Sequence, residues 1–167
     1  MTIETLFGQE ETTGKPRTVK FKQIKAIYET ITVKEEITDY LKTGTRYNTP
    51  SQVYETFRFL MKETKEMFMT LHLDGKNRIV CMDLVSIGSL NQSIVHPREV
   101  FKTACISNAA AIICVHQHPT GDPTPSSEDI SITRRLKEAG EIMGIKVLDH
   151  IIVGDGEYMS FVERGLL

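Results

Sequence analysis

Two histidines and one aspartate stand at a spacing that could bind a metal ion. His116 and His118 follow the apolar run 111–115, and Asp129 comes three residues after Ser126, which is predicted to cap a helix. Catalytic zinc takes three protein ligands of nitrogen or oxygen type and keeps the fourth position for water. Side chains two residues apart in a strand point the same way, so both imidazoles can face one ion. The pattern predicts a His-His-Asp zinc site with one open position.

Each part of this pattern also has an ordinary interpretation. A lone His-x-His pair arises easily by chance, and Ser126 with Asp129 forms a common helix-capping box. The connecting segment 119–125 contains three prolines, which fix their backbone φ angles and stiffen the loop. The joint arrangement favours the metal site, because an apolar strand, a histidine pair, a stiff loop and a helix start follow one another.

Hydrolysis at such a site needs a carboxylate that takes a proton from water. Five carboxylates upstream of the histidines are candidates for this role: Glu63, Glu66, Asp74, Asp83 and Glu99. Glu66 immediately precedes a predicted strand, and it would approach the histidines if that strand lay beside 111–115. The spacing alone leaves the choice among the five open.

The remaining histidines have less specific interpretations. His72 alternates within a predicted strand, which is typical of a structural or surface position, and His96 precedes a predicted helix as a neighbour of its cap. Asp149 and His150 are candidates to support the metal ligands from behind, as groups that orient ligating histidines often do.

Hydrophobic periodicity and turn residues predict an α/β fold with a mixed sheet and helices packed against it. Thr49 and Pro50 are typical of a helix start, Asp74-Gly75 of a hairpin turn, and Gly144 of a helix end. The segment 1–48 is predicted to be an N-terminal extension, with a strand near Val19 and a helix at 33–41, and 49–167 the main domain. We expect helices at 50–64, from Pro97 and from Ser126 to Gly144, and strands at 67–73, 78–85, 92–95, 111–115, 145–148, 151–153 and 158–162.

Composition bounds the class of protein. The chain has 167 residues, 40% of them hydrophobic, and a formal net charge of -2, which argues against a strongly basic nucleic-acid binder. No apolar run approaches the roughly 20 residues that span a bilayer, and 1–13 lacks a secretory pattern. We therefore expect a cytoplasmic protein with no membrane partner. The three cysteines, Cys81, Cys105 and Cys114, lie in apolar runs and are predicted to be buried free thiols.

The sequence resembles a known family at these residues. His-x-His, seven residues and Ser-x-x-Asp is the JAMM signature of MPN+/JAB metalloproteases, and His116, His118, Ser126 and Asp129 match it. Over about 49–167 the chain resembles the bacterial RadC family, in the stretches 66–74, 87–90, 95–101, 109–129, 133–140 and 148–154.

The resemblance implies a cytidine-deaminase-like α/β sandwich that binds Zn²⁺ through His116, His118 and Asp129. It places the carboxylate that acts through water at Glu66, and it gives Ser126 the role of stabilising the oxyanion. The implied activity is metallopeptidase hydrolysis of an amide or isopeptide bond in a protein or peptide substrate.

Two other functions are alternatives. RadC proteins usually carry a DNA-binding helix-hairpin-helix region, but 1–48 lacks its glycine hairpin pair, so the chain resembles a short member of the family. A role in DNA repair or mobile-element biology, with a structural metal site, is therefore weakened, as it is by the net charge. A scaffold that has lost its ligands is the third possibility, and the intact His-His-Asp set counts against it.

Overall fold

A computed structural model describes residues 23, 27–29, 44–88 and 95–167. The strand expected near Val19 and the helix expected at 33–41 lie outside these residues, as does all but Val95 of the strand expected at 92–95. In chain order the described elements are α2 (Pro50–Phe57), η2 (Arg58–Lys62), β1 (Met67–Leu73), β2 (Ile79–Ile87), α3 (Pro97–Ile106), β3 (Ala111–Gln117), α4 (Ser127–Met143), β4 (Lys146–Val153) and β5 (Tyr158–Ser160).

The strands of the described region form one mixed sheet in the order β2-β1-β3-β4-β5. Strand β1 runs antiparallel to both β2 and β3, whereas β3 and β4 are parallel and β5 is antiparallel to β4. Parallel neighbours need a crossover connection, and α4 provides it between β3 and β4. The predicted α/β fold with a mixed sheet is confirmed.

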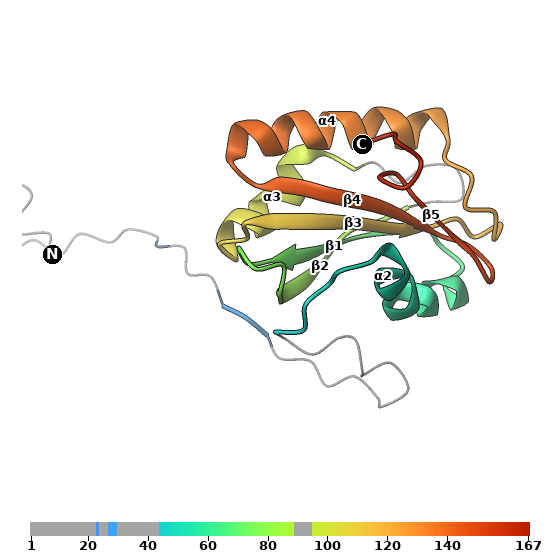
Figure 1. Cartoon of the computed structure of the whole chain (residues 1–167), viewed down its shortest axis with the longest axis horizontal. Helices are drawn as coiled ribbons and strands as arrows, with labels where there is room; N and C mark the ends of the chain where they lie inside the picture. Colours follow the sequence, from blue (N-terminus) through green and yellow to red (C-terminus); the bar gives the residue numbers. More distant parts are fainter. Residues whose placement is uncertain (1–22, 24–26, 30–43, 89–94) are drawn as a thin grey trace, which may run out of the picture.

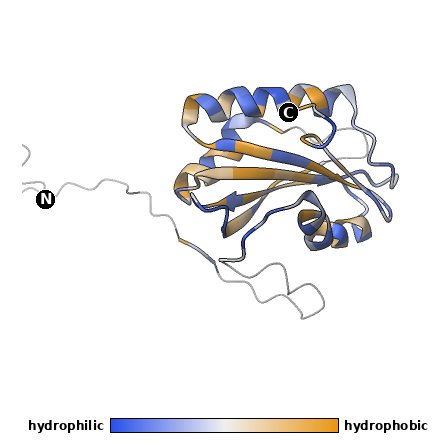
Figure 2. Ribbon diagram, viewed as in Figure 1, coloured by the Kyte–Doolittle hydropathy of each residue, from blue (hydrophilic) through white to orange (hydrophobic). Residues whose placement is uncertain are grey.

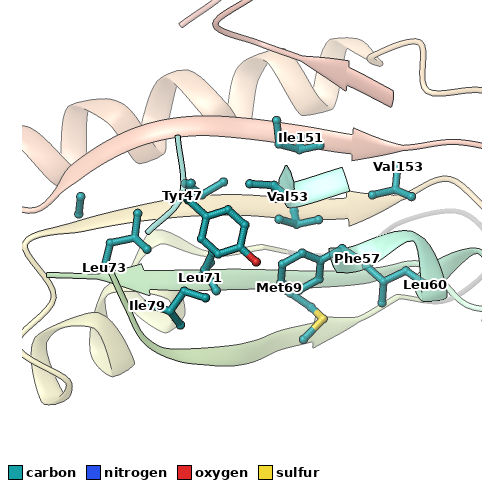
Figure 3. Close-up of a cluster of buried hydrophobic side chains, with 13 residues drawn as sticks. Tyr47, Val53, Phe57, Leu60, Met69, Leu71, Leu73, Ile79, Ile151 and Val153 are labelled. Carbon is teal, nitrogen blue, oxygen red and sulfur yellow. The ribbon is translucent and has the colours of Figure 1, made fainter. Parts of the chain in front are cut away.

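Helices cover both faces of the sheet (Figure 1). On one face, α2 and η2 pack over side chains from β1, β3 and β4, and Figure 3 shows this cluster with Phe57 and Leu60 at one end and Leu73 at the other. Its buried members are Tyr47, Val53, Phe57, Leu60, Met69, Leu71, Leu73, Ile79, Ala111, Ile113, Val115, Ile151 and Val153. This face carries no residue of the predicted metal site.

The opposite face packs against α3 and α4 around Phe68, Val100, Phe101, Ile112 and Leu136. Since both faces of β3 are covered, all its residues are buried, which explains the continuous apolar run 111–115 in place of an alternating pattern. Figure 2 shows hydrophobic stretches along the central strands, whereas α4 changes between hydrophilic and hydrophobic segments as it turns. The predicted site residues His116 and Asp129 lie on this face.

The first helix is shorter than predicted. Thr49 caps α2 through the backbone N–H of Gln52, as expected, but the α-helix ends at Phe57 and a 3₁₀ turn follows to Lys62, so the single helix expected at 50–64 is wrong. A 3₁₀ turn stacks side chains three residues apart. This stacking brings Phe57 and Leu60 into the same core cluster.

Strand β4 is continuous, although two separate pieces at 145–148 and 151–153 were expected. The polar pair between those pieces is buried: the Asp149 carboxylate accepts hydrogen bonds from the Ser160 hydroxyl at 2.6 Å and from the Val162 N–H at 3.1 Å. Asp149 and His150 pair with β3, so the strand continues through these two polar residues although their types do not indicate a strand.

Several smaller expectations are decided by the structure. Strands β2 and β3 run two residues beyond their predicted ends, and β5 ends two residues early. All three cysteines are free, but only Cys114 is buried, and Cys105 is exposed, so burial was wrongly predicted for it. Within the described ranges, no helix combines the length and the apolar character needed to cross a membrane.

Gly140 lets α4 approach the strand that follows it. A Cβ at this position would lie 2.4 Å from the Ile145 carbonyl oxygen and 3.3 Å from the Phe101 ring. Alanine favours a helix over glycine by about 1 kcal/mol, but overpacking costs about 1–3 kcal/mol. We therefore expect Gly140→Ala to lower the free energy of unfolding by up to about 2 kcal/mol in urea denaturation. The exposed Ser131→Ala, in the same helix, is the control; equal stability of the two variants would contradict the close packing.

Candidate metal centre

Three ligand atoms from two adjoining elements converge at one point. His116 lies in β3, His118 follows the strand directly, and Asp129 lies in the first turn of α4. The Nε2 atoms of the two histidines are 3.1 Å apart. The Asp129 carboxylate places Oδ1 3.2 Å from His116 Nε2 and Oδ2 3.4 Å from His118 Nε2. The structure thus brings together the three residues that the sequence predicted as ligands.

The proton on His118 is fixed by a backbone carbonyl. His118 Nδ1 lies 2.7 Å from the carbonyl oxygen of Asp122. A carbonyl oxygen only accepts hydrogen bonds, so Nδ1 must carry the proton and donate it. In the neutral imidazole, Nε2 is then left as a bare lone pair that faces His116 and Asp129.

The proton on His116 is fixed in the same way through two buried intermediates. The Thr133 hydroxyl donates to the Asp129 carbonyl at 2.6 Å, so it must accept from His150 Nδ1, also at 2.6 Å. His150 Nε2 then has no proton and accepts from His116 Nδ1 at 2.8 Å. His116 Nε2 is therefore a lone pair as well, and the chain of hydrogen bonds runs in one direction only.

Two imidazole lone pairs and a carboxylate thus face one another with no proton donor among them, and a cation at their centre would satisfy all three. A tetrahedral ion bound at about 2.0–2.1 Å separates its ligand atoms by about 3.3–3.4 Å. The two Nε2 atoms are 3.1 Å apart, and the Asp129 carboxylate reaches His116 with Oδ1 at 3.2 Å and His118 with Oδ2 at 3.4 Å. The residues therefore fit a metal ion. In the described part of the chain, the group consists of these three ligands.

Ser126 and Asp129 form the capping box expected at the start of α4. Ser126 Oγ accepts from the Asp129 N–H at 3.1 Å, and Asp129 Oδ2 accepts from the Ser126 N–H at 2.7 Å and from its hydroxyl at 2.6 Å. The two interpretations of this motif are compatible, since Asp129 caps the helix and faces the histidines at once. The cap holds the carboxylate in place before any ion binds.

Comparison with known proteins agrees with this geometry. A family profile described as RadC-like JAB domain matches residues 47–166. The chain belongs to this family. It is 67% identical to a UPF0758 protein of Pelobacter propionicus over 123 residues, which are 73% of this chain and 54% of the relative. It is 48% identical to a UPF0758 protein of Methanosarcina mazei over 149 residues, which are 89% of this chain and 64% of the relative. The chain thus spans somewhat more than half the length of these relatives.

The side chains in the site of this RadC-like JAB domain shift one another's pKa values. Burial alone would raise the pKa of Asp129, but the adjacent His116 and His118 imidazoles and the hydrogen bond from Ser126 outweigh it and hold that pKa far below its usual value. The adjacent Asp129 carboxylate raises the pKa of His118 because it favours a positive charge on the ring, with a smaller contribution from Glu66. Burial, together with the neighbouring His116, lowers the pKa of His150 well below its usual value. His150 is therefore neutral, as its place in the hydrogen-bond chain requires.

Glu66 lies just before β1 and close in register to the ligands. Strand β1 pairs with β3 up to Phe68 opposite His116. Extending this antiparallel register by two residues sets Glu66 opposite His118, on the face that His116 also occupies. The influence of Glu66 on the pKa of His118 agrees with this position.

Three of the other four candidate carboxylates have different partners in the structure. Asp74 holds the hairpin turn through Arg78 at 2.6 Å, Asp83 accepts from the Thr103 hydroxyl at 2.8 Å, and Glu99 pairs with Lys102 at 2.6 Å. The fourth, Glu63, is exposed at the C-terminal end of η2.

The loop that carries Asp122 is held by a close contact between two turns. The Asp155 N–H donates to the Gly121 carbonyl at 2.9 Å. A Cβ on Gly154 would lie 2.6 Å from that carbonyl oxygen and 2.7 Å from Pro123 Cδ. Only glycine fits here, and the contact fixes the loop whose Asp122 carbonyl orients His118.

The remaining sequence predictions for this region have mixed outcomes. His150 does contact a ligand, as proposed, but Asp149 is directed to the C-terminal segment instead. His96 is itself the N-cap of α3, through the Arg98 N–H, rather than a neighbour of the cap. His72 is buried and bonded to Thr70 and Ser107, which makes it structural. Sequence reasoning missed Thr133 and Gly154; the i+4 spacing of Thr133 from Asp129 was the available signal for the first.

Thr133 fixes the direction of the hydrogen-bond chain, so its hydroxyl should affect metal binding. We expect Thr133→Val, which keeps the shape, to weaken the binding of a divalent metal ion, with added Zn²⁺ as the probe, about 10–100-fold, as loss of groups that orient ligands does. Competition with a chromophoric chelator measures this affinity. Thr56→Val is the matched control, because Thr56 is also buried, donates to the carbonyl four residues earlier and meets a second side chain, Tyr47. Equal zinc affinity in both variants would contradict the role of the Thr133–His150–His116 hydrogen bonds in orienting the ligand.

Proposed function

We propose that this RadC-like JAB domain is a zinc-dependent hydrolase that cleaves an amide or isopeptide bond in a protein or peptide. The observation that carries the proposal is the convergence of two imidazole lone pairs and one carboxylate at a partly open surface. Side-chain exposure rises from 1% for His116 to 13% for Asp129 and 19% for His118. A substrate can therefore approach from the side of His118 while the opposite side is packed.

The donor set supports zinc as the ion. Two neutral imidazoles and a carboxylate with a position left open are typical of catalytic zinc. Zinc bound there would supply a Lewis acid that polarises a carbonyl group and lowers the pKa of water. His116, His118 and Asp129 would hold it, with both histidines oriented by their Nδ1–H donors.

Glu66 is assigned the proton transfers. Its carboxylate takes a proton from water as the water oxygen attacks the carbonyl carbon of the substrate. The protonated Glu66 side chain then gives that proton to the amide nitrogen as the carbon–nitrogen bond breaks, which leaves a carboxylic acid and an amine. The position of Glu66 opposite His118 supports this role, because the water and the leaving group must both lie beside the ligands.

Ser126 is assigned the stabilisation of the oxyanion. Its hydroxyl donates a hydrogen bond to Asp129 Oδ2, but a hydroxyl rotates freely and can donate to a new negative charge instead. Asp129 Oδ2 still accepts from the Ser126 backbone N–H when the hydroxyl turns away. Donation to the oxyanion therefore leaves the helix cap and the ligand in place.

Variants of Glu66 and His118 separate metal binding from catalysis. We expect Glu66→Gln to retain zinc and to slow hydrolysis of a quenched-fluorescence peptide and isopeptide library about 10²–10⁴-fold. His118→Ala should lose both zinc and activity. Elemental analysis and the fluorescence assay measure the two properties. Zinc retained in His118→Ala would refute the ligand set, and full activity in Glu66→Gln would refute the base.

Ser126 has two roles that a pair of substitutions can separate. Glycine is nearly as good an N-cap as serine, whereas alanine costs about 1 kcal/mol. We expect Ser126→Gly and Ser126→Ala to lose rate alike, about 10²–10³-fold, because both lack the hydroxyl donor. Only Ser126→Ala should lower the unfolding free energy noticeably. Rates that follow stability, with Ser126→Gly nearly active, would assign Ser126 to capping alone.

A role in DNA repair or mobile-element biology stays a prediction, as does the cytoplasmic location. The described residues supply no observation that favours nucleic acid over a peptide, and the net charge of -2 gives no electrostatic support.

A further inference from the structure

Gln117 stands between the two histidine ligands, and its side chain is fully buried. Its amide oxygen accepts from the Met67 N–H at 3.0 Å, and its amide nitrogen donates to the Lys65 carbonyl at 2.6 Å. These two peptide groups flank Glu66. Both polar ends of one buried side chain are therefore used on the backbone on either side of this residue.

The amide takes over where the regular strand pairing stops. The ladder between β1 and β3 ends at Phe68 opposite His116. A side-chain amide offers one donor and one acceptor, as a peptide group does, so Gln117 continues the ladder with its side chain. From the other side, the Gly88 N–H donates to the Glu66 carbonyl at 2.7 Å. The backbone of Glu66 is thus held from β3 and from the end of β2.

We propose that Gln117 is a positioning residue that fixes Glu66 relative to the metal ligands. The inference rests on the proposed role of Glu66 as the base. Because Gln117 adjoins His116 and His118 in the chain, one short segment sets the places of both the ligands and the base. Strand ends otherwise open easily, and a displacement of about 1 Å at a reacting group costs about 10²-fold in rate.

This role differs from a plain contribution to the core. In the described structure, neither hydrogen bond of the Gln117 side chain reaches a ligand atom. Loss of the amide should therefore leave zinc affinity unchanged and act on the chemical step rather than on substrate binding. A merely structural role would lower stability without separating kcat from KM.

Gln117→Met tests the proposal, since methionine has a similar length and is readily buried. We expect faster hydrogen exchange at the Met67 amide, a kcat about 10²-fold lower on the same peptide library, and unchanged KM and zinc affinity. Tyr47→Phe is the control, because it removes the buried hydrogen bond to Thr56 in the core cluster that packs against α2. It should lower stability without changing kcat or exchange at Met67.

The outcomes are distinct. Unchanged exchange at Met67, unchanged kcat, or a joint loss of kcat and zinc affinity in Gln117→Met would overturn the proposal. If the variant does not fold, exchange in the wild type decides, because the Met67 amide must then be as protected as that of Met69 inside β1. If the wild type cleaves nothing in the library, the proposed hydrolase function fails, while the exchange data still decide whether Gln117 holds this backbone.

Discussion

Two backbone carbonyl groups, those of Asp122 and Asp129, determine the chemistry of the metal centre. Because a carbonyl oxygen can only accept, each one forces the direction of every hydrogen bond that leads to it. The result is a neutral histidine on each path with its Nε2 lone pair turned inward. Without these anchors either imidazole could place a proton at the centre and exclude a cation. The preference of the site for a cation over a proton is thus set by backbone carbonyl groups.

The topology brings these groups together within a single β3–α4–β4 unit. Parallel strands joined by a helix set the end of the first strand beside the start of that helix, so His118 and Asp129 become neighbours although ten residues separate them. The register of β3 and β4 shifts by one residue, with Ile112 opposite Val147 but Ile113 opposite Asp149. Such an irregularity re-aims side chains. Simple alternation from Val147 would turn His150 away from α4, and the shift turns it back toward His116.

The sequence predicted the ligands because their signal is local: spacing in a strand and capping of a helix depend on near neighbours. It predicted the number and type of most described elements for the same reason. Glu66 came from the family resemblance, since spacing could not rank five carboxylates that only the sheet register distinguishes. Thr133 and Gln117 escaped notice because their roles depend on the direction of hydrogen bonds across strands. The shift in register hid the continuity of β4, because it breaks the alternation from which strands are recognised.

Asp129 shows why such a site can exist without unfolding the domain. A buried carboxylate beside two lone pairs is unfavourable unless other donors satisfy it, and Ser126 supplies two of them from the helix start. The cap stabilises α4 whether or not an ion is present. The fold therefore holds the Asp129 carboxylate in place despite the free-energy cost of burying it beside two lone pairs. Little rearrangement is then needed when a cation enters, since the two Nε2 atoms already lie 3.1 Å apart and each has an Asp129 carboxylate oxygen within 3.4 Å. Preorganisation of this kind would lower the free-energy cost of binding a metal ion, and it explains why one serine and one aspartate can serve both the fold and the candidate site.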